Sequence, residues 1–170
     1  MYLNGSEVMD IGTKEPKTKI AQGVQQLIKI IYTNLKMLNV DFTEAHITKI
    51  IKSQDDVLFK DKMHEVEIEV LNKIQRNTAN HDRTTIKNLI DYFYERPYGW
   101  YQSAVLCIIA KLYKRNKISL KRDNNILNDK EALEALLKSN QYANTIIEPE
   151  EEIQNTQVKK VKGLLSGIFQ

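Results

Sequence analysis

The sequence predicts a mainly α-helical protein with a small β component, in the α+β class. Glycine and proline supply only 6 and 3 of the 170 residues, about half of ordinary usage, which leaves few turn formers for a sandwich or a barrel. Apolar residues recur at helical spacing along most of the chain, whereas one short stretch near residue 120 alternates with period two. The 42% apolar and 28% charged content is typical of a soluble globular protein with a packed core.

The pattern along the chain divides it into four regions. Residues 1–17 are polar and lack a sustained period, so we expect a flexible leader. Residues 18–76 predict a helical subdomain, an N-terminal bundle. The polar stretch 77–82 is the best candidate for a boundary, after which 83–152 form a second subdomain. Residues 153–170 again show helical spacing and predict a C-terminal helix.

Three helices are expected in the helical subdomain. Apolar positions from Ile20 onward predict an amphipathic helix that continues to about Asn39. Thr43 is placed to cap a second, shorter helix. A third helix is predicted around residues 63–74, with Glu67 on its exposed side.

The second subdomain begins with two further helices. The first covers about 83–95 and must end near Arg96, because Pro97 disfavours helical geometry in the residue before it. The second covers about 100–115 and is apolar nearly all round between residues 104 and 110. A helix of that kind belongs in the centre of a core.

A hairpin follows these helices. Residues 118–121 alternate with period two, and the polar run 123–125 is a strong turn signal. Asn128 or Asp129 can cap another helix, and residues 145–149 predict an edge strand that ends in proline. Two helices, a turn and a small β-hairpin in this order predict a winged-helix-like unit.

The net charge of +3 conceals strongly charged blocks. Residues 1–95 hold 13 basic and 14 acidic side chains, whereas 96–122 hold seven basic ones and no acid. Residues 123–152 then hold two basic and eight acidic groups. The basic block is consistent with phosphate binding, although we favour simple solvation or pairing with the acidic block as its explanation. The candidate DNA or phosphate contacts are Lys114, Arg115, Lys117, Lys121 and Arg122.

The turn between the two helices of the second subdomain is the most unusual stretch of the sequence. It consists of Arg96, Pro97, Tyr98, Gly99 and Trp100. In one interpretation, the aromatic side chains anchor an interhelical turn in the core and their polar atoms reach backbone partners. In the other, the turn exposes an aromatic and arginine platform that contacts a partner protein or a nucleic acid.

No pattern for catalysis, a cofactor or a metal is found. The chain lacks a phosphate-binding loop, a dinucleotide fingerprint and a nucleophile elbow. His46, His64 and His81 fall on different predicted elements, which leaves no convergent set of metal ligands. Cys107 lies in an apolar run and is expected to be a buried, inert thiol. No apolar run is long enough to cross a membrane, and we expect a cytoplasmic protein.

The second subdomain resembles a segment of the large P-loop ATPases of BREX phage-defence systems, of the BrxC/PglY type. The resemblance rests on residues 89–93, 96–100, 104–112, 117–121 and 147–149. It extends loosely back to residues 27–39, whereas the nucleotide-binding motifs of those ATPases have no counterpart here. The resemblance therefore implies a non-catalytic segment, C-terminal to the nucleotide-binding region of an ATP-driven defence protein.

Two functional classes remain open. The first is a protein-interaction or interdomain coupling module that contacts other BREX subunits or other domains of the parent ATPase. The second is a winged helix that binds duplex DNA without sequence specificity through a basic helix end and wing. We rank the interaction module first, because the helix that would enter the groove starts at Trp100 and runs at once into an apolar stretch.

Overall fold

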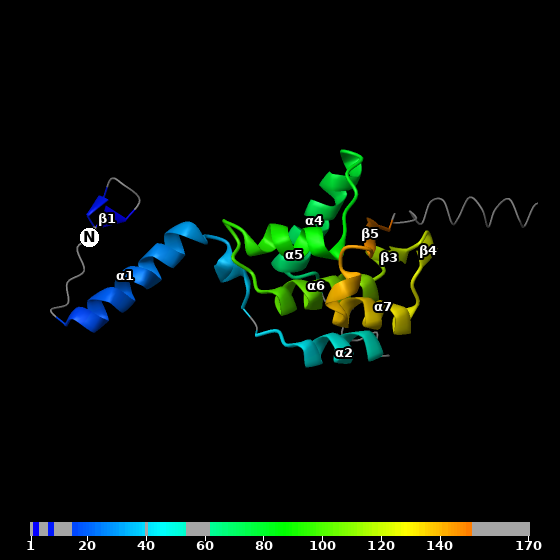
Figure 1. The fold of residues 1–170 in the computed structure, drawn as a ribbon, viewed down its shortest axis with the longest axis horizontal. Coiled ribbons are helices and arrows are strands. Elements are labelled where there is room, and N and C mark those ends of the chain that lie inside the picture. Colours follow the sequence, from blue (N-terminus) through cyan, green and yellow to red (C-terminus); the bar gives the residue numbers. More distant parts are fainter. Residues whose placement is uncertain (1, 4–6, 9–14, 40, 54–61, 151–170) are drawn as a thin grey trace, which may run out of the picture.

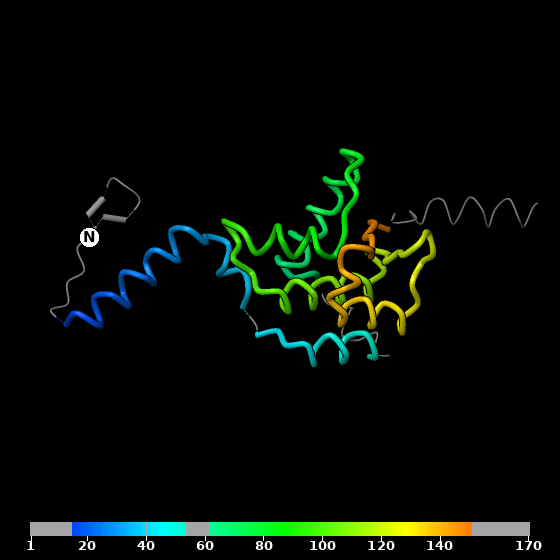
Figure 2. Tube along the Cα trace, viewed as in Figure 1, coloured from blue at the N-terminus to red at the C-terminus, as the bar shows by residue number. Residues whose placement is uncertain are grey.

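The structure is a computed structural model, and it describes residues 2–3, 7–8, 15–39, 41–53 and 62–150 (Figures 1 and 2). The helices in these ranges are α1 (Pro16–Ile31), α2 (Glu44–Lys52), α4 (Glu65–Ala79), α5 (Ile86–Tyr94), α6 (Gln102–Lys114) and α7 (Asp129–Leu137), with single 3₁₀ turns η1 (Leu35–Met37) and η2 (Ser139–Gln141). The strands are β1 (Tyr2–Leu3), β2 (Glu7–Val8), β3 (Ile118–Arg122), β4 (Asn125–Ile126) and β5 (Ile146–Pro149). The mainly helical class with a small sheet is confirmed. The predicted leader falls mostly, and the predicted C-terminal helix wholly, outside the described residues.

The helix starts follow local signals in the sequence. Thr43 precedes α2, and its backbone N–H donates to Nδ1 of His46 at 3.1 Å. Asn128 precedes α7, and its side-chain oxygen accepts from the backbone N–H groups of Lys130 and Glu131, both at 3.1 Å. Such caps satisfy N–H groups that have no partner inside the helix. Both predicted caps are therefore confirmed.

The sheet has the strand order β4–β3–β5, and both pairs are antiparallel. The hairpin turn between β3 and β4 has positive φ at Asp123 (50°) and Asn124 (64°). Asn and Asp tolerate this conformation better than most residues, which is why the polar run makes the turn. Strand β5 lies at an edge of the sheet, as predicted, and Pro149 offers no N–H to another strand there.

The core is built around α6. This helix packs against α2, α4, α5 and β3, so segments on both sides of the predicted boundary share one hydrophobic cluster. Eight of its residues are buried, namely Ala104, Val105, Leu106, Cys107, Ile108, Ile109, Ala110 and Leu112. The predicted central position of this helix is confirmed, whereas the division into two subdomains stays a prediction.

Helix α1 departs from the expected bundle. The predicted helix to about Asn39 is wrong, because α1 ends at Ile31 and gives way to the short turn η1. At the break, the backbone N–H of Asn34 donates to the carbonyl of Pro97 at 3.0 Å. This hydrogen bond to the α5–α6 turn replaces the one that Asn34 would make within a continued α1. From there α1 extends away from the body that α2 and α4–α7 form (Figure 1).

Candidate interaction site

The turn between α5 and α6 buries its aromatic residues. The exposed fraction is 6% for Tyr98 and 0% for Trp100, whereas Arg96 and Pro97 are exposed. The Trp100 ring stacks on Phe93, with centroids 4.7 Å apart and planes only 8° from parallel. This burial favours the interpretation of the two aromatics as anchors of the core.

The polar atoms of these aromatics have partners from distant segments. The Trp100 indole N–H donates to the carbonyl oxygen of Asn34 at 3.1 Å. The Tyr98 hydroxyl donates to Oε1 of Glu69 at 2.6 Å. Burial, and then the neighbouring Glu69 carboxylate, raise the pKa of Tyr98 well above its usual value. The turn therefore ties α4 and the segment after α1 to the start of α6.

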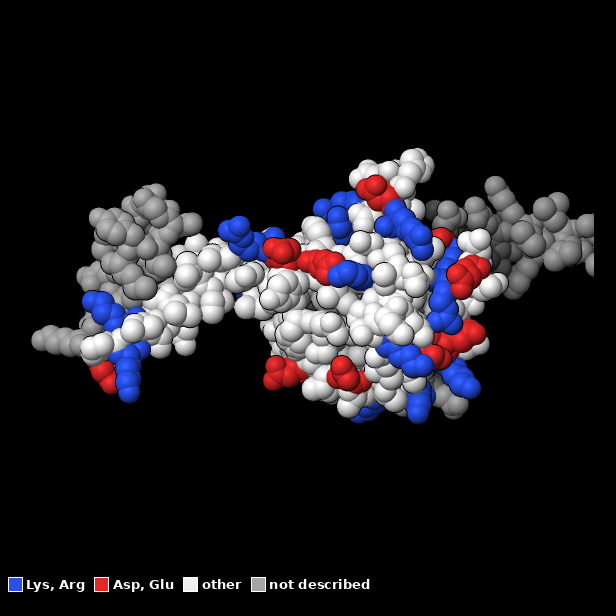
Figure 3. All heavy atoms as spheres, in the orientation of Figure 1, with Lys and Arg blue, Asp and Glu red and all other residues white. Residues whose placement is uncertain are grey.

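Among the residues that the structure describes, two of the five candidate phosphate contacts pair with residues of the acidic block. Lys114 Nζ lies 2.9 Å from Asp129 Oδ2, and Lys121 Nζ lies 2.5 Å from Glu148 Oε2. Figure 3 shows basic and acidic side chains next to one another on the right-hand part of the body. The opposite blocks in the sequence thus neutralise each other in space at these positions.

Arg115 forms an ion pair inside the protein. Its side chain is 8% exposed, and its Nε lies 3.0 Å from Oε2 of Glu67, which is fully buried. Lys111 Nζ lies 3.6 Å from the other oxygen of the same carboxylate. The prediction that Glu67 lies on the exposed side of its helix is wrong, because α4 turns this residue toward α6. The i, i+4 spacing of Lys111 and Arg115 was a signal in the sequence for a buried acidic partner, since two cations on one helix face can both pair with one carboxylate.

Arg122 lies in a polar hollow beside the turn of the β3–β4 hairpin, the wing of this fold. Its Nη1 donates to Oε1 of Gln141 at 2.7 Å. The hollow has a volume of about 330 Å³, and the exposed Arg83 also lines it. The sequence did not predict this residue, because Arg83 precedes Arg122 by 39 residues in the chain. The other lining residues are Asp123, Asn124, Asn144 and Ile146.

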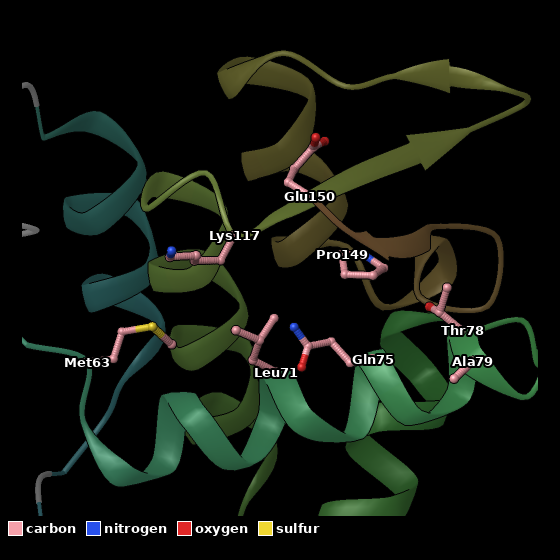
Figure 4. Close-up of a pocket in the computed structure, with 8 residues that line it drawn as sticks. All are labelled: Met63, Leu71, Gln75, Thr78, Ala79, Lys117, Pro149 and Glu150. Atoms are coloured by element: carbon pink, nitrogen blue, oxygen red, sulfur yellow. The ribbon is translucent and has the colours of Figure 1, made fainter. Parts of the chain in front are cut away.

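Lys117 lies in a different hollow, between α4 and the end of β5 (Figure 4). The volume of this hollow is about 710 Å³. The Lys117 side chain extends toward the side of the hollow where Met63 lies, whereas the Glu150 side chain points away from Met63. The remaining lining residues are Leu71, Gln75, Thr78, Ala79 and Pro149. Lys117 and Arg122 therefore line separate hollows, and the Arg115 side chain is buried.

The described residues contain no group of three or more histidine, cysteine or acidic side chains placed to hold a metal ion. Cys107 is fully buried, and burial raises the pKa of its thiol to about 11. Its Sγ lies 3.5 Å from the carbonyl oxygen of Thr43. Within the described ranges, no helix is both long and apolar enough to span a bilayer.

Helices α5 and α6 with their turn, followed by the β3–β4 hairpin, define a winged helix-turn-helix unit. A family model agrees with this class, since the winged helix-turn-helix domain of the BREX ATP-binding protein BrxC matches residues 34–151. The chain belongs to this family, as the sequence resemblance implied. No solved structure matches the chain with significant similarity. The match begins at Asn34, so α1 lies outside the matched domain.

Proposed function

We propose that this chain serves BrxC as a non-catalytic interaction module, which couples the ATP-binding protein to other BREX components or to its own remaining domains. The observation that carries the proposal is the burial of α6. In a winged helix that reads DNA, the second helix of the helix-turn-helix places polar side chains in the major groove. Here residues 104–110 are all buried where α6 packs against α2, α4 and α5, so polar side chains are accessible only at the two ends of the helix.

The charges support the same conclusion. Phosphate contacts require cations that are free to exchange counterions for phosphates. Lys114 and Lys121 have carboxylate partners at 2.9 and 2.5 Å, and Arg115 is 8% exposed. Lysine and arginine side chains that are already paired with a carboxylate gain less from DNA.

A second function, contact with duplex DNA without sequence specificity, is favoured by the wing hollow. There Arg83 and Arg122 share about 330 Å³ with two asparagine side chains. Two guanidinium groups and amide donors suit one phosphate, although Asp123 in the same hollow offsets part of the charge.

Duplex binding by the 170-residue chain tests the proposal. Labelled DNA is titrated with the chain from ~50 to ~200 mM salt, over which a protein with several phosphate contacts loses affinity steeply. We expect no saturable binding at the lowest salt. The variant Arg83→Ala/Arg122→Ala and the matched variant Lys87→Ala/Lys138→Ala, whose cations each sit in an exposed i, i+4 pair, separate the wing from general charge. If the wild type binds DNA tightly and only the Arg83→Ala/Arg122→Ala variant loses that binding, the DNA-contact function is supported and the interaction module is contradicted.

A further inference from the structure

Helix α1 carries an exposed apolar face. The exposed fractions are 59% for Ile20, 47% for Val24, 39% for Ile28 and 55% for Ile30. Ile20, Val24 and Ile28 follow one another at intervals of four, so they form a continuous stripe. Scattered apolar residues are normal on a surface, but a stripe of large aliphatic side chains on one helix marks a binding surface.

The stripe leads into an apolar hollow at the C-terminal end of α1. This hollow has a volume of about 570 Å³, and Ile28 belongs to both features. Its other lining residues are Gln25, Lys29, Tyr32, Thr33, Leu35 and Lys36. Such a surface suits an amphipathic helix that packs its apolar face along the stripe and inserts its last apolar side chain into the hollow.

This surface has a fixed attachment to the winged-helix body. The carbonyl oxygen of Asn34 accepts the Trp100 indole N–H, and the Asn34 N–H donates to Pro97. The Tyr32 ring lies so close to Gly99 that a β-carbon there would come within 2.6 Å of it. The segment that follows α1 is therefore held against the α5–α6 turn by two hydrogen bonds and one packing contact.

The charged residues within α1 and in the hollow at its end are all basic. Lys17 and Lys19 stand in the first turns of α1 and Lys29 in its last turn, and no acidic residue occupies the first turn. The N-terminus of a helix already carries partial positive charge, so Lys17 and Lys19 add to a field that attracts carboxylates. Figure 3 shows uncharged surface along the middle of α1, with basic side chains toward its ends and an acidic side chain among those at the far left. The N-cap residue of α1 is the acidic Glu15.

We propose that α1 is the docking site for an acidic amphipathic helix of a partner protein. This inference rests on the proposed function and names the surface and the chemistry of its partner. The partner helix lays its apolar side chains along the stripe and places Asp or Glu beside the lysines. A second copy of α1 fits poorly, because it would bring the same lysines together. A lipid surface fits less well, since the polar face holds three glutamines, Gln22, Gln25 and Gln26, beside only two lysines, whereas interfacial helices are rich in lysine and arginine there.

The test uses two labelled synthetic peptides of three heptads each, with leucine at the apolar positions and either glutamate or lysine beside them. Fluorescence anisotropy measures their binding to the 170-residue chain. We expect the glutamate peptide to bind at least ~10-fold more tightly than the lysine peptide. In the chain, Ile20→Asp/Val24→Asp should weaken that binding at least ~10-fold. Ile126→Asp, at a β4 residue that is 66% exposed, is the matched control and should leave it unchanged.

Four results would overturn the inference. These are absence of binding by the glutamate peptide, equal binding of both peptides, stripe-dependent binding to phosphatidylserine vesicles in place of the peptide, and stripe-dependent dimers in sedimentation experiments without peptide. Circular dichroism checks that the aspartate variants keep their helix content. Because the peptides contain no BREX protein, failure here leaves the interaction module intact on another surface, whereas tight duplex binding would refute the module itself.

Discussion

The Tyr32 ring packs directly over Gly99, where a β-carbon would lie 2.6 Å from Cδ1 of the ring. Gly99 also has a φ of +63°, in the left-handed region that favours glycine. The residue after α1 and the turn before α6 therefore fit together only because position 99 has no side chain. This contact joins the helix outside the family match to the winged-helix body.

Gly99→Ala should destabilise the protein by about 2 kcal/mol or more, through the strained φ and the contact with Tyr32. Urea denaturation measures the free energy of unfolding. In a Tyr32→Ala background the clash is gone, so the same glycine substitution should cost only the backbone strain of about 1–2 kcal/mol. An equal cost in both backgrounds would contradict the packing.

Breaking the buried ion pair should cost far more than breaking an exposed one. Glu67→Ala removes a fully buried carboxylate from its pair with Arg115, and removing one partner of a buried ion pair costs about 3–5 kcal/mol. The comparison is Asp91→Ala, which removes the Lys87 pair on the surface of α5 and should cost about 0.5 kcal/mol. Urea denaturation of both variants provides the values. Similar costs would mean that Glu67 is hydrated.

The two hydrogen bonds of the aromatic turn should differ in value. Trp100→Phe leaves the Asn34 carbonyl without this donor in a partly buried place, at a cost of about 2 kcal/mol. Tyr98→Phe should lower the free energy of unfolding by only about 1 kcal/mol. The Glu69 carboxylate loses the Tyr98 hydroxyl but keeps a second partner, since Arg76 lies 3.7 Å away. The order of the two unfolding free energies is the test, and the reverse order would show that the indole N–H bond is unimportant.

Stability should fall as the pH rises above about 9. The unfolded thiol of Cys107 loses its proton near pH 9.0, whereas burial raises its pKa in the folded protein to about 11. Between these values the folded state binds more protons, so the free energy of unfolding decreases with pH. Burial also raises the pKa of Tyr113 to about 12, which extends the decline to higher pH.

Cys107→Ala isolates the contribution of the thiol to this decline. The variant should lose stability at pH 7 through its smaller side chain, yet show a shallower decline between pH 9 and 11. The difference in slope should approach about 1 kcal/mol per pH unit. Urea denaturation at several pH values gives both slopes, and identical slopes would place the ionisation elsewhere.

Much of the fold could be predicted because its signals are local. The apolar run 104–110 indicated a buried helix, the turn at Asp123 and Asn124 indicated the hairpin, and Thr43 and Asn128 indicated helix starts. Each signal depends on neighbours within a few residues, so the sequence alone carries it.

The site was harder to predict, because distant partners determine it. Helix α1 breaks where Asn34 bonds to Pro97 and Trp100, more than 60 residues later. Glu67 can be buried because Lys111 and Arg115, at the C-terminal end of α6, form ion pairs with its carboxylate. A hydropathy pattern reports which face of a helix is apolar, but not whether another segment covers that face or neutralises a charge beside it.

Co-purification with the other components of a BREX system tests the central claim most directly. The 170-residue chain, its stripe variant Ile20→Asp/Val24→Asp and its cation variant Lys117→Ala/Lys121→Ala/Arg122→Ala are each co-expressed with those components and purified after nuclease treatment. The account predicts that the wild type and the cation variant retain a BREX partner and that the stripe variant loses it. Loss of the partner in the cation variant alone, or on nuclease treatment of the wild type, would contradict the account and point to DNA.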